Sequence, residues 1–296
     1  LTDLNRIYTM RVDIDKKLAE NSISPANNNA RSWIDAFSAE TKLTVSSVRS
    51  DHTFTSEARC IATGGDYFIF HPLKLLSGSY YSDSDLMQDR VVIDNNLAWQ
   101  LFGSYDVAGM NILINGEYFY IAGVILPDSD KATEYVTGTA PAIYISYTAL
   151  EKLSGGTASA INCYEVCLPD PVTGLAEKIT RDVSHADDKH IRIINNSERF
   201  SLLNLWKIVS EGENRVVSDY PMVYPFWENA ARITEEKAAD ILAAMIFSLI
   251  IPVLTVIMLI RRLIVNRRLI LHSAAEKLIA ALHNIANPLR RKRRNI

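Results

Sequence analysis

The sequence predicts an α+β domain that is followed by one transmembrane helix and a basic amphipathic tail. Three observations predict it: a run of 20 residues without a charge, an uneven distribution of charge, and alternating strand-like and helix-like segments before the run. Of the 296 residues, 48% are hydrophobic and 22% are charged, which excludes a disordered chain. Three cysteines are too few for a small disulfide-stabilised scaffold.

The transmembrane helix is predicted over residues 238–262, around the uncharged run from Ile241 to Ile260. Such a helix rises about 1.5 Å per residue, so the run spans about 30 Å, the thickness of a hydrocarbon core. Pro252 lies within the run, and transmembrane helices tolerate proline. A buried core helix is the alternative, but core helices are rarely apolar on every side over this length.

The distribution of charge orients this helix. Residues 261–296 hold ten of the 31 Lys and Arg residues and one of the 34 Asp and Glu residues, so they carry +9, and the rest of the chain carries −12. Basic residues at one end of an apolar run indicate the cytoplasmic side. We therefore expect residues 1–235 to lie outside a cell membrane, in a bacterial setting, and residues 263–296 inside. The predicted basic anchor consists of Arg261, Arg262, Arg267, Arg268, Arg290, Arg291, Lys292, Arg293 and Arg294.

The tail has two parts. Apolar residues between Leu271 and Ile285 recur at helical spacing, which predicts an amphipathic helix. Such a helix can lie along the inner leaflet or dock on a cytoplasmic partner. The basic run Arg290–Arg294 follows it, and a basic residue beside a membrane gains about 1 kcal/mol from anionic lipid. Nucleic-acid binding is disfavoured, because the domain is acidic and the tail lies beside a membrane.

An exported domain needs a targeting segment. The chain begins at Leu1 and shows no basic segment followed by an apolar leader. We expect that an upstream segment has been removed, either a signal peptide or an N-terminal membrane helix. With an upstream helix, the domain would be a large loop between two membrane spans.

Residues 1–235 show a mixed α/β pattern. Strands are predicted where apolar and polar residues alternate, and helices where apolar residues recur every three or four positions. The predicted strands are Tyr8–Ile14, Leu43–Arg49, Phe54–Ala62, Arg90–Ile93, Asn111–Ile114, Glu117–Val124, Ala142–Ile145, Ile161–Leu168 and Ile191–Asn195. The predicted helices are Ala30–Thr41, Asn96–Phe102, Tyr147–Leu153, Pro171–Val183 and Ser197–Ser210. The pattern indicates a split βαβ unit with an inserted, hairpin-rich α+β subdomain over about 64–146.

Two local signals are specific. Asn115-Gly116 separates two strand-like segments, and this pair supplies the two positive φ angles of a type I′ hairpin turn. Asp94 or Asn95 can cap the helix that follows, because a short side-chain oxygen accepts a hydrogen bond from an unpaired backbone N–H. Gly103 is predicted to end that helix.

A series of short motifs runs through residues 65–126. Its members, in order, are Asp66-Tyr67-Phe68, Leu75-Leu76-Ser77-Gly78, Val91-Val92-Ile93, Leu97-Ala98, Leu101-Phe102-Gly103, Asp106-Val107-Ala108-Gly109 and the hairpin Ile112–Val124. Their order and spacing resemble the MacB-like periplasmic core domain of MacB/FtsX-type ABC transporter permeases. The motif positions singled out are Asp66, Phe68, Gly78, Leu97, Phe102, Gly103, Gly109, Asn115, Gly116 and Gly123. Two positions depart from the family pattern: Ser79 replaces the usual arginine, and Ala108 replaces the usual proline.

The resemblance implies a non-enzymatic membrane component whose outer domain couples the motion of membrane helices to a substrate or partner outside. It also implies the partners: the lipid bilayer, a separate cytoplasmic ABC ATPase, further permease subunits, and an extracytoplasmic protein or substrate. Permeases of this type commonly have four membrane helices, and this sequence predicts one. We therefore expect the remaining helices to come from partner subunits.

Catalytic and metal-binding motifs are absent from the sequence. It contains no G-x-x-x-x-G-K-[S/T], H-E-x-x-H, C-x-x-C or G-x-S-x-G, and it predicts no cofactor. Two groups of side chains have the chemistry of metal ligands but fit polar loops better. The first group is His185, Asp187, Asp188 and His190. The second group is Asp83, Asp85 and Asp89.

The cysteines are interpreted as small buried hydrophobic residues. Cys163 and Cys167 lie four residues apart on a predicted strand, about 13 Å by strand rise, which is too far for a mutual disulfide. Either one could pair with Cys60 if the fold brought them together.

Aromatic residues gather shortly before the apolar run. They are Trp206, Tyr220, Tyr224, Phe226 and Trp227. Packing within the outer domain or its stalk is the favoured interpretation, and an aromatic belt at the membrane surface is the alternative.

Two classes of function remain open. The favoured class is a membrane-anchored component of an ATP-driven transporter or mechanotransmission complex. The alternative is a stand-alone membrane-anchored sensor or binding module for a ligand or protein, and a deep apolar pocket in the outer domain would favour it.

Overall fold

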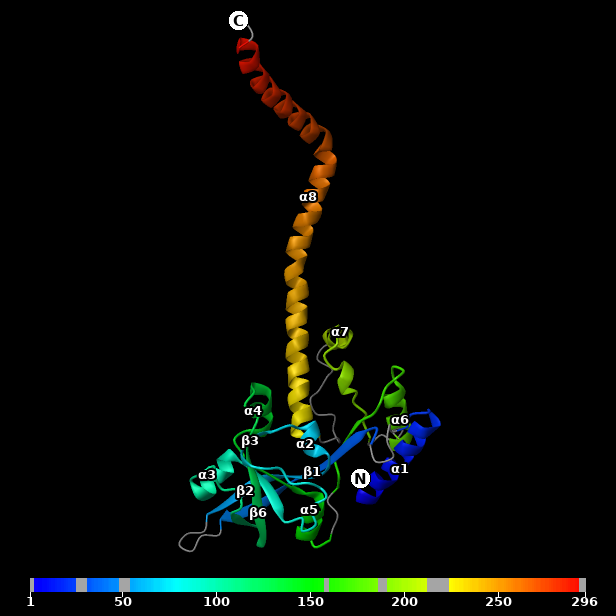
Figure 1. Ribbon diagram of the computed structural model, residues 1–296, viewed down its shortest axis with the longest axis vertical. Coiled ribbons are helices and arrows are strands. Elements are labelled where there is room, and N and C mark those ends of the chain that lie inside the picture. The colour runs from blue at the N-terminus through cyan, green and yellow to red at the C-terminus, as the bar shows by residue number, and fades with distance from the viewer. Residues whose placement is uncertain are drawn as a thin grey trace.

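A computed structural model describes residues 3–24, 31–47, 54–156, 160–185, 191–211 and 224–292. Figure 1 shows a domain of strands and helices from which a single long helix, α8, extends. The strands are β1 (Ile34–Ser47), β2 (Thr55–Gly65), β3 (Lys74–Gly78), β4 (Arg90–Asp94), β5 (Asn111–Ile114), β6 (Glu117–Leu126), β7 (Ala142–Ser146) and β8 (Cys163–Cys167). The helices are α1 (Leu4–Glu20), α2 (Tyr67–Phe70), α3 (Asn95–Phe102), α4 (Lys131–Thr137), α5 (Tyr147–Leu153), α6 (Leu175–Ser184), α7 (Leu202–Glu211) and α8 (Phe226–Lys292).

All eight strands belong to one mixed sheet with the order β2-β7-β4-β6-β5-β1-β8. The strand β1 also pairs with β2 along most of its length, so six of the strands form a closed ring of pairings. The pairs β2–β7 and β4–β6 are parallel, and the other pairs are antiparallel. The strand β3 joins the ring through β6, and β8 joins it through β1. The predicted α+β class is therefore confirmed.

Alternate side chains along the strands enter two separate cores, as the two-residue period of a strand requires. Phe37 and Ile143 enter a large core that is covered by α3 and α5. Their neighbours Ala36 and Tyr144 enter a smaller core on the opposite side. This smaller core also receives aromatic residues from α2 and from the first turn of α8. The sheet thus presents one face to the beginning of the long helix.

Several predicted elements are confirmed. The segment Phe54–Ala62 lies largely within β2, which pairs antiparallel with β1, and the two strands around Asn115-Gly116 form the hairpin β5–β6. The φ angles of Asn115 and Gly116 are 49° and 91°, both positive as a type I′ turn requires. The Asp94 side chain caps α3 by accepting a hydrogen bond from the Leu97 backbone N–H at 2.7 Å.

The prediction of a strand over Tyr8–Ile14 is wrong, because this segment lies within helix α1. The residues that α1 buries follow a helical period and are Ile7, Met10, Ile14 and Leu18. Tyr8 and Val12 are apolar but exposed, and they produce an alternating pattern that imitates a strand. Apolar residues on the solvent side of a helix can therefore mislead a period-based prediction.

The prediction of a helix over Ala30–Thr41 is also wrong. From Ile34 onward this segment forms β1, and its residues 35–39 are buried on both faces. A strand buried on both faces loses the alternation that identifies a half-buried strand. Because residues 35–39 of β1 have no solvent-facing side, apolar residues need not alternate there. The spacing of Trp33, Ile34 and Phe37 then imitates that of a helix.

Smaller corrections concern the segment after β8. The helix predicted from Pro171 begins only at Leu175, after Gly174 in a left-handed conformation with φ of 89°. The predicted strand Ile191–Asn195 is an irregular segment. The helix predicted over Ser197–Ser210 is divided into a short 3-10 turn, Asn196–Glu198, and α7.

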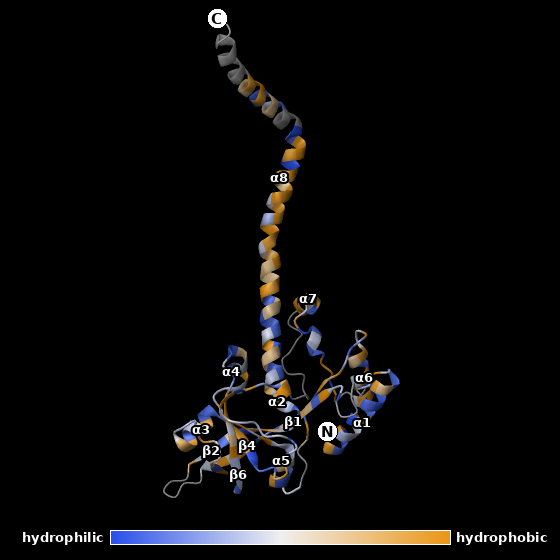
Figure 2. Ribbon diagram, viewed as in Figure 1, coloured by the Kyte–Doolittle hydropathy of each residue, from blue (hydrophilic) through white to orange (hydrophobic). Residues whose placement is uncertain are grey.

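The helix α8 is continuous from Phe226 to Lys292, including the position of Pro252. Its segment Phe226–Arg267 is long and apolar enough to cross a membrane, and its most apolar window is not buried by any described part of the chain. Figure 2 shows that hydrophobic residues dominate the middle of α8, beyond the sheet domain. Figure 1 shows that the helix changes direction after this apolar segment. We define the α8 base as residues 226–239 and the α8 span as residues 241–260.

Candidate functional site

The α8 base docks on the sheet and carries a connected group of polar contacts. It begins at Phe226, directly after Pro225, and Glu228 places a carboxylate in the first turn, where the helix dipole favours negative charge. One side of the base contacts aromatic residues from α2. Another side carries a cluster of buried charges.

The aromatic side holds Trp227 in a layer of rings. The Trp227 ring centroid lies 5.9 Å from that of Tyr67 and 4.6 Å from that of His71, both in or beside α2. Phe226 packs edge-on against Trp227 at 5.0 Å, and the Arg59 guanidinium lies 4.1 Å from the Phe226 ring centroid. Ring pairs of this kind contribute about 0.5–1.5 kcal/mol beyond the area they bury. These contacts attach the first turn of α8 to the smaller core.

Two carboxylates of the sheet lie beside this layer. Glu40 of β1 accepts a hydrogen bond from the Phe226 backbone N–H at 3.3 Å, and Glu165 of β8 lies 2.7 Å from Nε2 of His71. Burial raises the pKa of Glu40 above its usual value, and the hydrogen bond from Phe226 and the charge of Arg59 oppose this rise. The first N–H groups of a helix have no partner within the helix, so Glu40 fulfils the role of a cap that comes from the sheet.

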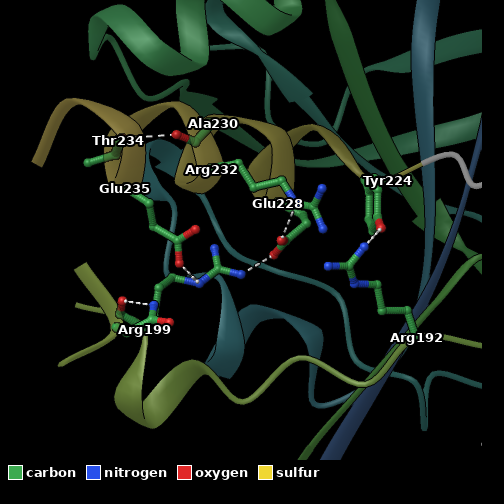
Figure 3. Close-up of polar contacts among 9 residues, drawn as sticks. Arg192, Arg199, Tyr224, Glu228, Ala230, Arg232, Thr234 and Glu235 are labelled. Carbon is green, nitrogen blue, oxygen red and sulfur yellow. Dashed lines mark hydrogen bonds and ion pairs between the residues drawn. The ribbon is translucent and has the colours of Figure 1, made fainter. Parts of the chain in front are cut away.

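The charged side is a balanced group of two arginines and two glutamates, which we name the ion quartet: Arg199, Glu228, Arg232 and Glu235. Arg199 lies before α7, and the other three residues lie on α8. Figure 3 shows the Arg199 guanidinium between the two glutamates. Its Nη2 is 2.5 Å from Glu228 Oε2, and its Nε is 3.3 Å from Glu235 Oε1. Arg232 Nε donates to the other oxygen of Glu228 at 2.9 Å.

Three members of the ion quartet are buried, and the Arg232 side chain is 14% exposed. The side chains of Arg199, Glu228 and Glu235 are 7%, 10% and 5% exposed. Charges removed from water lose several kcal/mol of hydration each, so they persist only when opposite charges and hydrogen bonds compensate them. The two positive and two negative charges of the quartet provide this balance, which makes each member dependent on the others.

Further contacts hold the segment before α8 against its base. The Arg232 guanidinium lies 3.8 Å from the ring centroid of Tyr224, and Arg192 donates to the Tyr224 hydroxyl at 3.1 Å. The Asn204 side chain of α7 donates to the backbone oxygen of Arg199 at 2.6 Å. Figure 3 shows Arg192, Arg199 and the α8 residues converging in one place. The connecting segment is thus attached at Arg192, Arg199 and Tyr224.

Two helices support the α8 base from the sides, because both α4 and α7 contact α8. Leu205 and Ile208 of α7 pack against Ala239, with Ala238 and Leu242 beside them. The charges of the α8 base therefore pair with each other and join α8 to the segment before α7. Among the residues that the structure describes, no group of three or more His, Cys, Asp or Glu residues could hold a metal ion.

The two sequence-based metal candidates do not form sites where they are described. His185 is the C-cap of α6, with φ of 52°, and Asp187, Asp188 and His190 lie outside the described residues. Asp83 accepts a hydrogen bond from the Gly65 N–H at 3.2 Å, and Asp85 pairs with Arg90 at 3.7 Å. Asp89 contributes its backbone oxygen to the Tyr120 N–H.

Two motif glycines face each other across β3 and β6. Gly78 is paired with Gly123, and a Cβ on Gly78 would lie 2.1 Å from the Ala122 backbone oxygen. Its φ of 75° adds a second reason for glycine. Nearby, the rings of Phe68 and Tyr80 are stacked with centroids 4.4 Å apart.

The remaining motif positions lie in the sheet domain and away from the ion quartet. Leu97 is fully buried in the large core, Phe102 packs beside it, and Gly103 ends α3 in a left-handed conformation. Asp66 pairs with Arg31 at 3.6 Å, and the Gly109 N–H donates to the Ile121 oxygen. The structure gives these motif residues packing and turn-forming positions.

The predicted membrane residues Ile241, Pro252 and Ile260 all lie on α8 and are exposed. Of the basic anchor residues, Arg261, Arg262 and Arg267 follow the span on the same helix, and all three are exposed. The backbone of α8 also includes Arg268, Arg290, Arg291 and Lys292, whose side chains are not described. The last two anchor residues, Arg293 and Arg294, lie outside the described residues.

The ion quartet was missed by sequence reasoning. Glu228, Arg232 and Glu235 are spaced by four and three residues, which places them on one face of a helix. This spacing is the only local signal, and it normally indicates a solvated face. The distant partner Arg199 gives no signal in the sequence.

The three cysteines are free, so no disulfide joins Cys60 to Cys163 or Cys167. Burial raises the pKa of the Cys60 thiol and of the Cys163 thiol. The predicted role of buried hydrophobic residue fits Cys60, whereas Cys167 is exposed.

A hollow of about 750 Å³ lies between the loop 79–90 and β6. Its lining is mixed, with Asp85, Asp89 and Arg90 beside Leu86 and Met87. Leu86 and Met87 are 97% and 75% exposed, so the loop presents apolar side chains to the surface. The hollow lacks the enclosed apolar wall of a typical small-molecule pocket.

Fold and site together define a membrane-anchored protein with a folded domain held on one helix. The family model of the MacB-like periplasmic core domain matches residues 2–182, well over half of the chain. The chain therefore belongs to this family, and the resemblance found in the sequence is confirmed. Membership makes it a component of an ABC-type membrane transporter with an extracytoplasmic domain.

Solved structures that match part of the chain were also found, and no curated protein matches. One of them is the extracellular domain of the noncanonical ABC-type transporter YknZ from Gram-positive bacteria, which is 14% identical with a TM-score of 0.40. The match covers 59% of this chain and 79% of that chain. The periplasmic region of MacB from Actinobacillus actinomycetemcomitans is 22% identical, with a TM-score of 0.41 and coverages of 59% and 72%. A domain of a putative permease from Porphyromonas gingivalis is 15% identical, with a TM-score of 0.32 and coverages of 59% and 69%.

Proposed function

We propose that this chain is a non-enzymatic permease component whose extracytoplasmic domain follows the movement of its membrane helix. The observation that carries the proposal is the α8 base, where an unbroken helix is attached to the sheet by aromatic packing and to the segment before α7 by the ion quartet. A rigid attachment converts tilt or rotation of the span into displacement of the whole domain. Such coupling needs no reaction at the site itself.

The length of α8 suits this role. From Phe226 to Ile241 the helix rises about 22 Å at 1.5 Å per residue, so the attachment lies well outside the hydrocarbon core. A small tilt of the span is therefore amplified at the domain. A loop in place of this segment would absorb the motion instead of transmitting it.

The energy source is proposed to be a separate ATPase subunit. The sequence contains no G-x-x-x-x-G-K-[S/T] motif, and the family acts with ABC ATPases. The exposed α8 span offers a surface for further membrane helices of partner subunits. Residues 263–296 are proposed to lie in the cytoplasm, because basic residues directly follow the span.

A mild-detergent pull-down of the tagged chain, read by mass spectrometry, tests the assembly. Stoichiometric recovery of an ABC ATPase subunit is expected. Recovery of the chain alone, or only with extracytoplasmic proteins, contradicts the proposal. The matched control is the same chain with the span intact but residues 268–296 deleted, which tests whether the tail contributes to ATPase recovery.

Cysteine labelling of intact cells tests the orientation. We expect a membrane-impermeant reagent to label Glu117→Cys on the exposed β5–β6 turn and to leave Lys277→Cys in the tail unlabelled. Both variants carry Cys167→Ser, which removes the exposed native thiol. Labelling of Lys277→Cys from outside contradicts the proposed orientation.

The alternative function, a stand-alone binding module, is favoured by one observation: the exposed Leu86 and Met87 at the rim of the hollow. Under this alternative, the double variant Leu86→Ser and Met87→Ser loses an extracytoplasmic protein from the pull-down. Retention of every recovered protein by this variant argues against the alternative.

A further inference from the structure

The helix α7 exposes an apolar face that the sheet domain does not cover. Leu202, Leu203 and Trp206 are 72%, 84% and 52% exposed, and Phe200, just before the helix, is 53% exposed. An isolated exposed leucine is ordinary in a folded protein, but adjacent large apolar side chains on one short helix indicate a surface for interaction.

Viewed down its axis, with successive residues 100° apart, α7 has three sectors. Leu205 and Ile208 face α8, where they are buried. Leu202, Leu203 and Trp206 form the adjacent sector, and it is exposed. Asn204 and Lys207 occupy the remaining sector, and Ser210 lies among the exposed apolar residues. The two apolar sectors are continuous, so the helix is amphipathic with one apolar half.

The position of α7 along α8 identifies what meets the exposed sector. The α8 residues that pack with α7 are Ala238, Ala239 and Leu242, directly at the start of the α8 span. In Figure 1, α7 is seen nearly end-on while α8 runs along the picture, so α7 crosses α8. A helix that crosses a membrane-spanning helix at the start of its apolar run lies approximately in the membrane plane.

We propose that α7 is an interfacial helix that inserts Leu202, Leu203 and Trp206 between the lipid headgroups of the outer leaflet. Amphipathic helices bind membranes in this way, with their apolar side at the boundary between headgroups and acyl chains. Tryptophan prefers this depth because its ring is apolar and its N–H is polar. The inference rests on the proposed membrane crossing of α8.

Interfacial binding gives α7 a mechanical role. The backbone oxygen of Arg199 accepts a hydrogen bond from Asn204 of α7, and the Arg199 side chain belongs to the ion quartet. Through these contacts α7 joins the lipid surface to the α8 base. It fixes the depth at which α8 enters the membrane and opposes sliding of the helix along its axis.

Brominated lipids provide a direct test, because bromine quenches tryptophan fluorescence at short range. The full chain is reconstituted in nanodiscs with phosphatidylcholine brominated near the headgroup. We expect Trp206→Phe to lose most of the quenching seen in the unchanged chain. The control Trp99→Phe removes an exposed tryptophan of α3 and leaves the quenching unchanged. Equal quenching of the unchanged chain and Trp206→Phe overturns the proposal.

A second series resolves the faces of the helix. In the Trp206→Phe background, Leu203→Trp is expected to restore the quenching, and Lys207→Trp in the polar sector is not. Ile251→Trp in the same background reports on the span with lipid brominated deep in the acyl chain. If Ile251→Trp is quenched and Leu203→Trp is not, α8 crosses the membrane but α7 does not lie at its surface, which overturns the interfacial helix alone. If neither Ile251→Trp nor Leu203→Trp is quenched, the membrane crossing of α8 is overturned as well.

Discussion

The two parts of α8, the base and the span, belong to one helix but have opposite surroundings. The base buries Glu228 and Glu235 among arginines and packs Trp227 among aromatic rings. The span exposes its large apolar side chains, and no described residue covers its most apolar window. The domain therefore contacts the helix at its base and, through Leu242 and α7, at the very start of the span. The span keeps its large apolar side chains uncovered by the described part of the chain.

The chemistry of the two parts follows from this difference. In the base, buried charges need matched partners, so each side chain depends on a particular neighbour. In the span, lipid accepts any apolar side chain, so individual residues are exchangeable. Mutations should therefore have large effects on stability in the base and small ones in the span.

The largest effect is expected for Glu228→Ala. This change leaves the buried Arg199 and the largely covered Arg232 without the carboxylate that both contact. Removal of one partner from a buried ion pair costs about 3–5 kcal/mol, so we expect the free energy of unfolding to fall by about this amount. Urea unfolding of the full chain in detergent, followed by circular dichroism, measures it.

Glu177→Ala is the matched control, because Glu177 pairs with Arg181 at 3.0 Å on the exposed side of α6. An exposed pair contributes about 0.5 kcal/mol or less. If the two variants lose the same stability, the ion quartet does not hold the base.

Trp227→Ala should have the next largest effect. Trp227 is partly exposed and touches the rings of Tyr67, His71 and Phe226, so its truncation should cost about 2 kcal/mol, less than for a fully buried tryptophan. The same unfolding experiment measures it, with Trp99→Ala on the surface of α3 as the control. A loss no greater than that of Trp99→Ala would show that the aromatic layer contributes little.

Glu40→Gln should change the pH dependence of stability. Burial raises the folded-state pKa of Glu40 above 4.5, so the folded state binds this proton more tightly than the unfolded state. The stabilisation of the folded state by this protonated Glu40 is therefore fully present below pH 4.5. It is lost as pH rises through the raised pKa of Glu40. Glutamine retains an oxygen for the Phe226 N–H but does not ionise. We expect a flatter profile of melting temperature above pH 4.5, and an unchanged profile contradicts the assignment.

Ile251→Ala in the span should have the smallest effect. Ile251 is 73% exposed, so its truncation should change the unfolding free energy of the extracytoplasmic domain by less than about 0.5 kcal/mol. Urea unfolding monitored at the domain measures this quantity. A loss close to that of Trp227→Ala would mean that the span, too, contributes to holding the domain.

The sequence predicted the parts of the molecule that depend on local chemistry. The span was visible as an uncharged run, and the β5–β6 turn was visible in Asn115-Gly116 because few residue pairs adopt two positive φ angles. The first helix and the first strand were interchanged, because α1 has apolar residues on its solvent side and β1 is buried on both faces. Burial is decided by tertiary contacts, and a period in the sequence does not report it.

The site was less predictable than the fold. Its aromatic residues Phe226 and Trp227 were expected to pack within the domain or its stalk, and they pack against α2. The ion quartet joins Arg199 to glutamates 29 and 36 positions away, and no local pattern pairs residues over such a separation. The boundaries of the domain, the span and the tail at 235, 238–262 and 263 remain predictions, since α8 runs through all of them without interruption.

A measurement of distance tests the central claim, that the domain and its membrane helix move as one body. Nitroxide labels are placed at Glu117→Cys on the β5–β6 turn and Asp240→Cys directly after the α8 base, in a Cys167→Ser chain in nanodiscs. Pulsed electron paramagnetic resonance should give one narrow distance distribution, which Glu228→Ala broadens. A broad distribution in the chain with an intact ion quartet would contradict the rigid attachment of the domain.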